Sequence, residues 1–310
     1  AMGTSVGTIT LITPIAVAVS DASGFGLPLC VATVVGGAMF GDNLSFISDT
    51  TIAACNGQGC AMKDKFKGNF WIALPAAVGT LALVLLLTGR QESFEIHGNY
   101  NLVQIVPYLL VLLGGIVGIN VFVVLLAGVV SGAAIVLATG AVVPAEGQTA
   151  FTQLLSNMGA NMAGMFETCM VAVLASALCA LIRENGGFDA LLNGIRKVFK
   201  GRRGGQLGMA ALVGVLDVAT ANNTVAIVMA NPIAKEISAE YGIEPKNAAS
   251  ILDTFSCLIQ GIIPYGAQLL MAAGLAGVSS ISISGYLYYP FVMGLFAIGS
   301  IIFRLPRRYS

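Results

Sequence analysis

The sequence predicts an all-α polytopic membrane protein. Hydrophobic residues make up 56% of the 310 residues, and charged residues make up only 10%. The mean hydropathy is +0.87, whereas a soluble domain carries roughly 25% charged residues. Apolar stretches close to the ~20 residues that a helix needs to cross a bilayer recur along the chain. The 38 glycines suit closely packed or broken helices inside the membrane.

Uninterrupted apolar stretches predict individual membrane crossings. They lie at Trp71–Thr88, Asn101–Gly118, Ile119–Thr139, Asn161–Ile182 and Tyr286–Phe303. Three other apolar stretches contain Gly, Pro, Asn or Asp near their middle; these are Leu27–Gln58, Gly208–Ile237 and Asn247–Ala276. Such breaks are tolerated in a membrane only where the backbone is buried in protein or lines a wet cavity. We therefore expect broken helices and re-entrant hairpins there.

The basic residues predict the orientation of the chain. They cluster at Lys63–Lys67, Arg196–Arg203 and Arg304–Arg308. An even number of predicted crossings separates the first two clusters, and a re-entrant hairpin over Gly208–Ile237 brings the third to the same side. Positively charged loops stay in the cytoplasm. We therefore expect a multi-pass protein of the cell membrane, with all three clusters cytoplasmic and Gly89–Asn101 outside.

Two stretches of the chain look alike when one is shifted by 218 residues without gaps. Thr4 falls on Asn222, Pro14 on Pro232 and Gly24 on Gly242. Each copy reads as the second arm of a hairpin followed by a broken helix, and inverted repeats with paired broken helices are typical of secondary transporters. Residues 161–221 precede the second copy, but only three residues precede the first. We therefore expect an N-terminal portion to be missing.

The first predicted break, Gly41–Thr51, carries the densest polar chemistry in an apolar region. One Asp at mid-bilayer costs roughly 2.5–3.5 kcal/mol on insertion scales, so such a group needs a ligand or a wet cavity. Carboxylate, hydroxyl and unwound carbonyl oxygens suit Na⁺. The candidate ligands are Asp42, Asn43, Ser45, Ser48, Asp49 and Thr50, with Asp49, Ser48 and Thr50 expected to hold Na⁺. An extramembrane loop between two short helices is the alternative.

The second break and the tip before it predict a site of lower charge. The candidate residues are Asn222, Asn223, Thr224, Gln260 and Gln268, to which the first tip adds Thr4 and Ser5. The alternative is helix-break chemistry without a ligand. Glu167, Asp217 and Asp253 lie in apolar surroundings, where an acid can exchange protons. Each could instead be a neutral carboxyl group that is hydrogen-bonded between helices.

The residue inventory argues against an enzyme, a cofactor and a nucleic-acid partner. Four of the six cysteines lie in apolar runs, where cysteine behaves as a small hydrophobe. The single histidine, His97, lies in a polar loop. Asp42 and Asp49 lack the Gly-x-Gly-Asp context of aspartyl intramembrane proteases, and the chain has no HExxH motif. The expected partners are therefore ions, a small solute and lipid.

The chain resembles the NhaC family of sodium/proton antiporters over essentially its whole length. The motifs are GTSVGTITLITPIA at 3–16, GGAMFGDNLSFISDTT at 36–51, ANNTVAIVMANPIA at 221–234 and IIPYGAQ at 262–268. Phe46 stands where relatives usually carry proline. The resemblance implies an elevator-type homodimer in which Na⁺ binds between each hairpin tip and the adjacent unwound loop. Thr4 and Ser5 would then belong with 42–51, and Asn222–Thr224 with Gln260–Gln268.

These observations predict a secondary active Na⁺/H⁺ antiporter. The alternative is a Na⁺-coupled transporter of an amino acid or another small organic solute. The expected organisation is a first transport-domain repeat at 1–60, scaffold helices at 61–150, a scaffold helix with a basic linker at 151–205, a second transport-domain repeat at 206–276 and a C-terminal transmembrane helix at 277–310.

Overall fold

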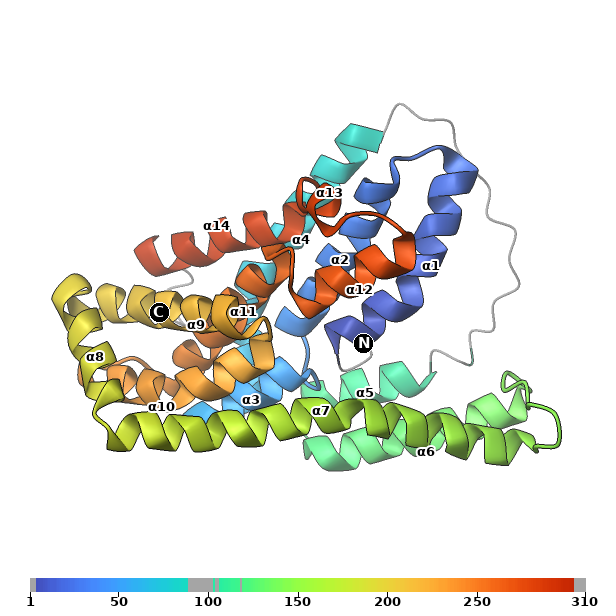
Figure 1. Ribbon diagram of the computed structural model, residues 1–310, viewed down its shortest axis with the longest axis horizontal. Coiled ribbons are helices and arrows are strands. Elements are labelled where there is room, and N and C mark those ends of the chain that lie inside the picture. The colour runs from blue at the N-terminus through green and yellow to red at the C-terminus, as the bar shows by residue number, and fades with distance from the viewer. Residues whose placement is uncertain (1–3, 89–102, 104–105, 118, 304–310) are drawn as a thin grey trace. The chain divides into compact units, whose positions relative to one another are not determined.

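The computed structural model describes residues 4–88, 103, 106–117 and 119–303 (Figure 1). The first helices are α1 (Ser5–Ser23), α2 (Leu27–Asn43), α3 (Asp49–Gln58), α4 (Met62–Thr88), α5 (Val106–Val117), α6 (Val121–Ala138) and α7 (Ala150–Glu184). They are followed by α8 (Gly187–Val198), α9 (Gly201–Thr220), α10 (Asn223–Tyr241), α11 (Pro245–Ile262), α12 (Ala267–Ala276), α13 (Ser280–Ser284) and α14 (Tyr288–Phe303). The described residues contain no strand, which confirms the all-α prediction.

The chain forms two compact units. The first contains residues 1–94 and 175–310, and the second contains residues 95–174. In the second unit, α5 packs against α6 through glycines. A Cβ atom on Gly114 would lie 2.9 Å from Val124, and one on Gly128 would lie 2.5 Å from Val111. Small residues of this kind let apolar helices approach closely without a hydrophobic driving force.

Two helical stretches among the described residues are long and apolar enough to cross a membrane, at Met62–Thr88 and Pro245–Ala276. Only 11% of the most apolar window of α4 is buried. A core helix of a soluble protein would be mostly covered, whereas α4 exposes Leu81, Leu85 and Leu86. Large contiguous apolar surface of this kind marks an interaction surface, and here it suits contact with lipid.

The first unit contains two interrupted helices. The helical stretch that begins at Leu27 ends at Asn43, and α3 begins after Ser48, whose side chain caps it. The stretch that begins at Pro245 ends at Ile262, and α12 begins after Gly266. Pro264 lies in this second gap, where it has no amide hydrogen to continue a helix. Both interruptions lie where the sequence predicts helix breaks.

Helix bounds in the two halves of the first unit match closely. Adding 218 to the bounds of α1 gives those of α10, and adding 218 to the bounds of α3 gives those of α12. Thr4 and Asn222 cap the first pair of helices with their side chains. The C-cap glycines that follow also match, because Gly24, Gly242, Gly59 and Gly277 are all left-handed.

The packing of these helices is reciprocal. In the first unit α1 packs against α12, and α10 packs against α3 (Figure 1). Likewise α14 packs against α2, and α11 packs against α4. The offset of 218 residues relates α1 to α10 and α3 to α12, so the contact of α1 with α12 corresponds to the contact of α10 with α3. A two-fold operation produces this pattern.

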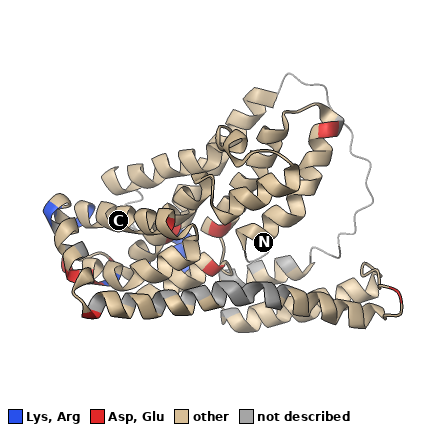
Figure 2. Cartoon of the chain, viewed as in Figure 1, with Lys and Arg blue, Asp and Glu red and all other residues tan. Residues whose placement is uncertain are grey.

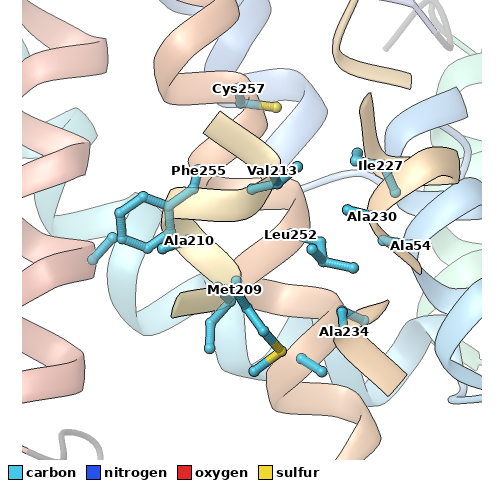
Figure 3. Packing of buried hydrophobic residues seen from close by; sticks show 14 of the residues in the cluster. Ala54, Met209, Ala210, Val213, Ile227, Ala230, Ala234, Leu252, Phe255 and Cys257 are labelled. Atoms are coloured by element: carbon cyan, nitrogen blue, oxygen red, sulfur yellow. The ribbon is translucent and has the colours of Figure 1, made fainter. Parts of the chain in front are cut away.

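Two buried clusters hold the first unit together. Figure 3 shows part of the larger one, in which Val213 of α9, Ile227 of α10 and Leu252 of α11 meet. The smaller cluster joins α1, α2, α12 and α13 and includes Ile9 and Ile283. Dense packing around the interrupted helices fixes the positions of their ends, where the polar residues lie.

Most charged side chains of the first unit lie away from these ends. Figure 2 shows Lys and Arg gathered where α8 and α9 meet, at the predicted basic cluster Arg196–Arg203. Lys197, Lys200 and Arg203 are exposed there. The predicted basic cluster Arg304–Arg308 and the predicted outer loop Gly89–Asn101 lie outside the described residues.

Candidate ion-binding site

The first helix break is a turn in which two serine side chains form hydrogen bonds with the backbone. Ser48 donates its hydroxyl hydrogen to the main-chain carbonyl of Asp42 at 3.2 Å and accepts from the amide of Thr51 at 3.3 Å. The Ser45 hydroxyl accepts from the amides of Ile47 and Ser48, each at 3.0 Å. These bonds satisfy backbone groups that the interrupted helix leaves open. The oxygen atoms of the break are therefore held in fixed positions.

Two carboxylates lie at this break. Asp42 is 3% exposed, and its Oδ2 atom has no hydrogen-bond partner among the described residues. Asp49 is partly buried at the first position of α3, where the helix N-terminus favours a negative charge. Its Oδ1 accepts from the amide of Thr50 at 3.0 Å. Ser48 and Thr50 are also buried, so the polar side chains of the break are packed inside the unit.

The two predicted hairpin tips are helix N-termini. Thr4 accepts from the amide of Gly7 at 3.0 Å, and Asn222 accepts from the amide of Val225 at 3.1 Å. The two tips thus use the same capping chemistry, in which a side-chain oxygen satisfies a free amide of the first turn.

Each tip also contacts the break in the other half of the unit. The Thr224 hydroxyl donates to Asp49 Oδ2 at 2.8 Å, and the Gln268 amide donates to the Ser5 hydroxyl at 3.1 Å. The resemblance had paired each tip with the break of its own half. The structure adds these crossed contacts, so that both tips and both breaks meet in one polar centre.

The second break is organised by two glutamines. Gln260 donates its side-chain amide to the carbonyl of Ala221 at 2.9 Å and to Gln268 Oε1 at 2.5 Å. Ala221 has φ of 52°, a left-handed conformation that costs energy for a residue with a Cβ atom. The bond from Gln260 holds this strained tip in place. The Oε1 atom of Gln260 is buried without a hydrogen-bond partner among the described residues, as is the side-chain nitrogen of Asn223.

Lys65 is fully buried at the first break. The sequence predicts it, with Lys63 and Lys67, in a cytoplasmic basic cluster and not among the site residues. Lys63 and Lys67 are exposed, but Lys65 is 0% exposed and forms a 2.6 Å ion pair with Asp253. Nothing local in the sequence marks Lys65 as buried, because it lies between Lys63 and Lys67 and ahead of the apolar stretch that begins at Trp71.

The three predicted proton-carrying acids have different surroundings. Asp253 lies 2.6 Å from the Lys65 ammonium and also accepts from Asn69 at 2.9 Å. Asp217 lies fully buried near the end of α9, and neither carboxylate oxygen has a hydrogen-bond partner among the described residues. Glu167 belongs to α7, and its side chain lies outside the described residues.

An apolar helical bundle with buried carboxylates at interrupted helices defines a membrane transport protein that handles cations. The chain belongs to the Na⁺/H⁺ antiporter family, whose profile matches residues 1–90 and 96–305. Family membership makes it a secondary active transporter that exchanges Na⁺ for H⁺, as the sequence predicted.

Three relatives are similar over most of the chain. The Na⁺/H⁺ antiporter NhaC of Bacillus subtilis is 25% identical, with 95% of this chain and 70% of the relative covered. The NhaC antiporter of Alkalihalophilus pseudofirmus is 23% identical, with 95% and 68% covered. A malate-2H⁺/Na⁺-lactate antiporter of Bacillus subtilis is 20% identical, with 94% and 68% covered. The family and the first two relatives favour Na⁺/H⁺ exchange over Na⁺-coupled transport of an organic solute.

Proposed function

We propose that this chain exchanges Na⁺ for H⁺ across the cell membrane at the first helix break, with Asp49 as the central ligand. The observation that carries the proposal is the Asp49 carboxylate, which lies at the start of α3 and accepts the hydroxyl of Thr224 from the opposite tip. Ser48 and Thr50 flank it in the sequence, their hydroxyl oxygens lie 3.3 Å apart, and both serve as hydroxyl ligands in this proposal. A hard cation needs oxygen ligands of this kind.

Charge balance explains why the exchange would be coupled. A dehydrated Na⁺ in a buried site requires a full negative charge, because neutral oxygens shape a site without balancing it. The same carboxylate can take a proton instead of the ion. Occupancy by one cation then excludes the other. The site therefore crosses the membrane with Na⁺ in one direction and with H⁺ in the other.

Purified protein in sealed proteoliposomes tests this function. An outward Na⁺ gradient is expected to acidify the lumen, as a trapped pH-sensitive dye would show, and addition of external Na⁺ is expected to reverse the signal. Radiolabelled amino acids and carboxylates added with and without a Na⁺ gradient form the second arm. Solute uptake that needs Na⁺, with no Na⁺-driven pH change, would contradict Na⁺/H⁺ exchange and identify the protein as a Na⁺-coupled symporter.

The architecture around the site supports an inverted repeat. The matching helix bounds and the reciprocal packing of α1 on α12 and α10 on α3 fit two halves related by a two-fold axis. With the hairpins entering from opposite faces, that axis lies in the membrane plane. The resemblance to the NhaC family implies an elevator-type movement of the interrupted helices against a dimeric scaffold, and this movement is part of the proposal.

The orientation predicted by the basic clusters can be tested in intact cells. Single cysteines at positions 97 and 200, placed in a cysteine-free background, are expected to react differently with a membrane-impermeant thiol reagent. Position 97 should be labelled from outside, and position 200 should be labelled only after the membrane is opened. The reverse pattern would rule out the proposed topology.

A further inference from the structure

Lys65 of α4 makes three polar contacts without any exposed surface. Its ammonium donates to the hydroxyl of Thr51 at 2.7 Å and to the main-chain carbonyl of Asn43 at 3.3 Å, and it forms the 2.6 Å ion pair with Asp253. An ammonium group has three donor hydrogens, so all of them are used. The first two contacts lie on opposite sides of the helix break.

We propose that Lys65 is the positioning residue of the ion site, because its ammonium joins the end of α2 to the first turn of α3. Asn43 is the last residue of α2, and Thr51 is the third residue of α3. A group bound to both fixes the relative position of the two helix ends. The carboxylates of Asp42 and Asp49 lie on those ends, so Lys65 sets the spacing at which they meet a cation. This inference rests on the proposed function.

Asp253 anchors this arrangement of α2, α3 and α4 to a fourth helix, α11. Its carboxylate accepts from Lys65 and from Asn69, while Asn69 also donates to the Asn43 carbonyl at 3.0 Å. The Ser250 hydroxyl in turn bonds to Asn69. Lys65 and Asn69 therefore both donate to one carbonyl group at the end of α2, and Asp253 and Ser250 of α11 bind these two donors. A side-chain network of this kind restricts the position of that carbonyl group.

The pair also determines which charges face the ion. Asp42, Asp49, Asp253 and Lys65 are near enough for their charges to interact. Lys65 balances Asp253 by direct contact, which leaves Asp42 and Asp49 as the carboxylates without a cationic partner. The Asn43 carbonyl and the Thr51 hydroxyl both accept from Lys65, whereas the Asp49 carboxylate faces Thr224.

Na⁺-dependent exchange by purified variants in proteoliposomes tests the inference, with the KM for Na⁺ and the maximum rate measured separately. The double variant Lys65→Met, Asp253→Asn removes both charges of the pair, so neither member is left as an unpaired buried charge. We expect its KM for Na⁺ to rise about tenfold or more, the loss of roughly one charge-assisted interaction. Lys63→Met, which removes an exposed lysine two residues away, should leave KM and maximum rate unchanged.

A merely structural ion pair would lower the amount of active protein and the maximum rate without changing KM. A double variant that folds and retains the wild-type KM within twofold therefore overturns the inference. If that variant fails to fold, Thr51→Val decides. It removes one Lys65 acceptor, together with the bonds of the same hydroxyl to Ser48 and to the Asp42 carbonyl, and it keeps the ion pair. A severalfold rise in its KM supports positioning, and an unchanged KM refutes it. Absence of Na⁺-driven exchange in the wild type would overturn the proposed function as well.

Discussion

Asp49→Asn is expected to abolish Na⁺-dependent exchange while the protein still folds. The substitution keeps the side-chain shape and an oxygen that can accept from Thr224, but it removes the charge that balances Na⁺. A lost charge-assisted interaction of about 3 kcal/mol lowers affinity roughly a hundredfold. Asn cannot carry the competing proton either, so both halves of the exchange should fail. The measurement is the Na⁺-driven pH change in proteoliposomes.

Size-exclusion chromatography in detergent should give the same monodisperse peak for Asp49→Asn as for the wild type. A partly buried carboxylate without a basic partner opposes folding, so its removal carries little structural cost. Asp64→Asn is the matched control, because Asp64 is an exposed carboxylate at the start of α4. Wild-type exchange by Asp49→Asn with unchanged Na⁺ dependence would move the ligand role to Asp42.

In contrast to Asp49→Asn, Asp253→Leu is expected to reduce the stability of the folded protein before it affects Na⁺ binding. It leaves the Lys65 ammonium fully buried without its counter-ion. Removal of one partner from a buried ion pair costs about 3–5 kcal/mol. We expect a marked fall in the yield of folded protein and in the Tm measured in detergent.

The double variant Lys65→Met, Asp253→Asn provides the control for this prediction. Because it leaves neither charge without a partner, its Tm should recover toward the wild-type value. A Tm of Asp253→Leu within a few degrees of the wild type would mean that Lys65 finds another partner or is not charged there, which would contradict the 2.6 Å ion pair with Asp253.

The sequence by itself determined the helical class and the positions of the helix breaks. Both depend on local chemistry. Long apolar runs must satisfy their backbone groups as helices in lipid. At the breaks, the Ser48 side chain caps the helix that follows it, and Pro264 has no amide hydrogen with which to continue a helix. The same locality explains the capping roles of Thr4 and Asn222, which follow from their place before an apolar run. The density of polar groups at 41–51 likewise marked the candidate site.

Only the tertiary structure decided which of these groups meet. Thr224 reaches Asp49 across 175 residues of chain, and Lys65 reaches Asp253 although the two are far apart in sequence. No periodicity or composition encodes such a pair, because its energy comes from the packing of α4 and α11 around the break. A lysine beside two other lysines reads as part of a solvated cluster. Burial by those neighbouring helices makes it the fixed cation of the polar centre.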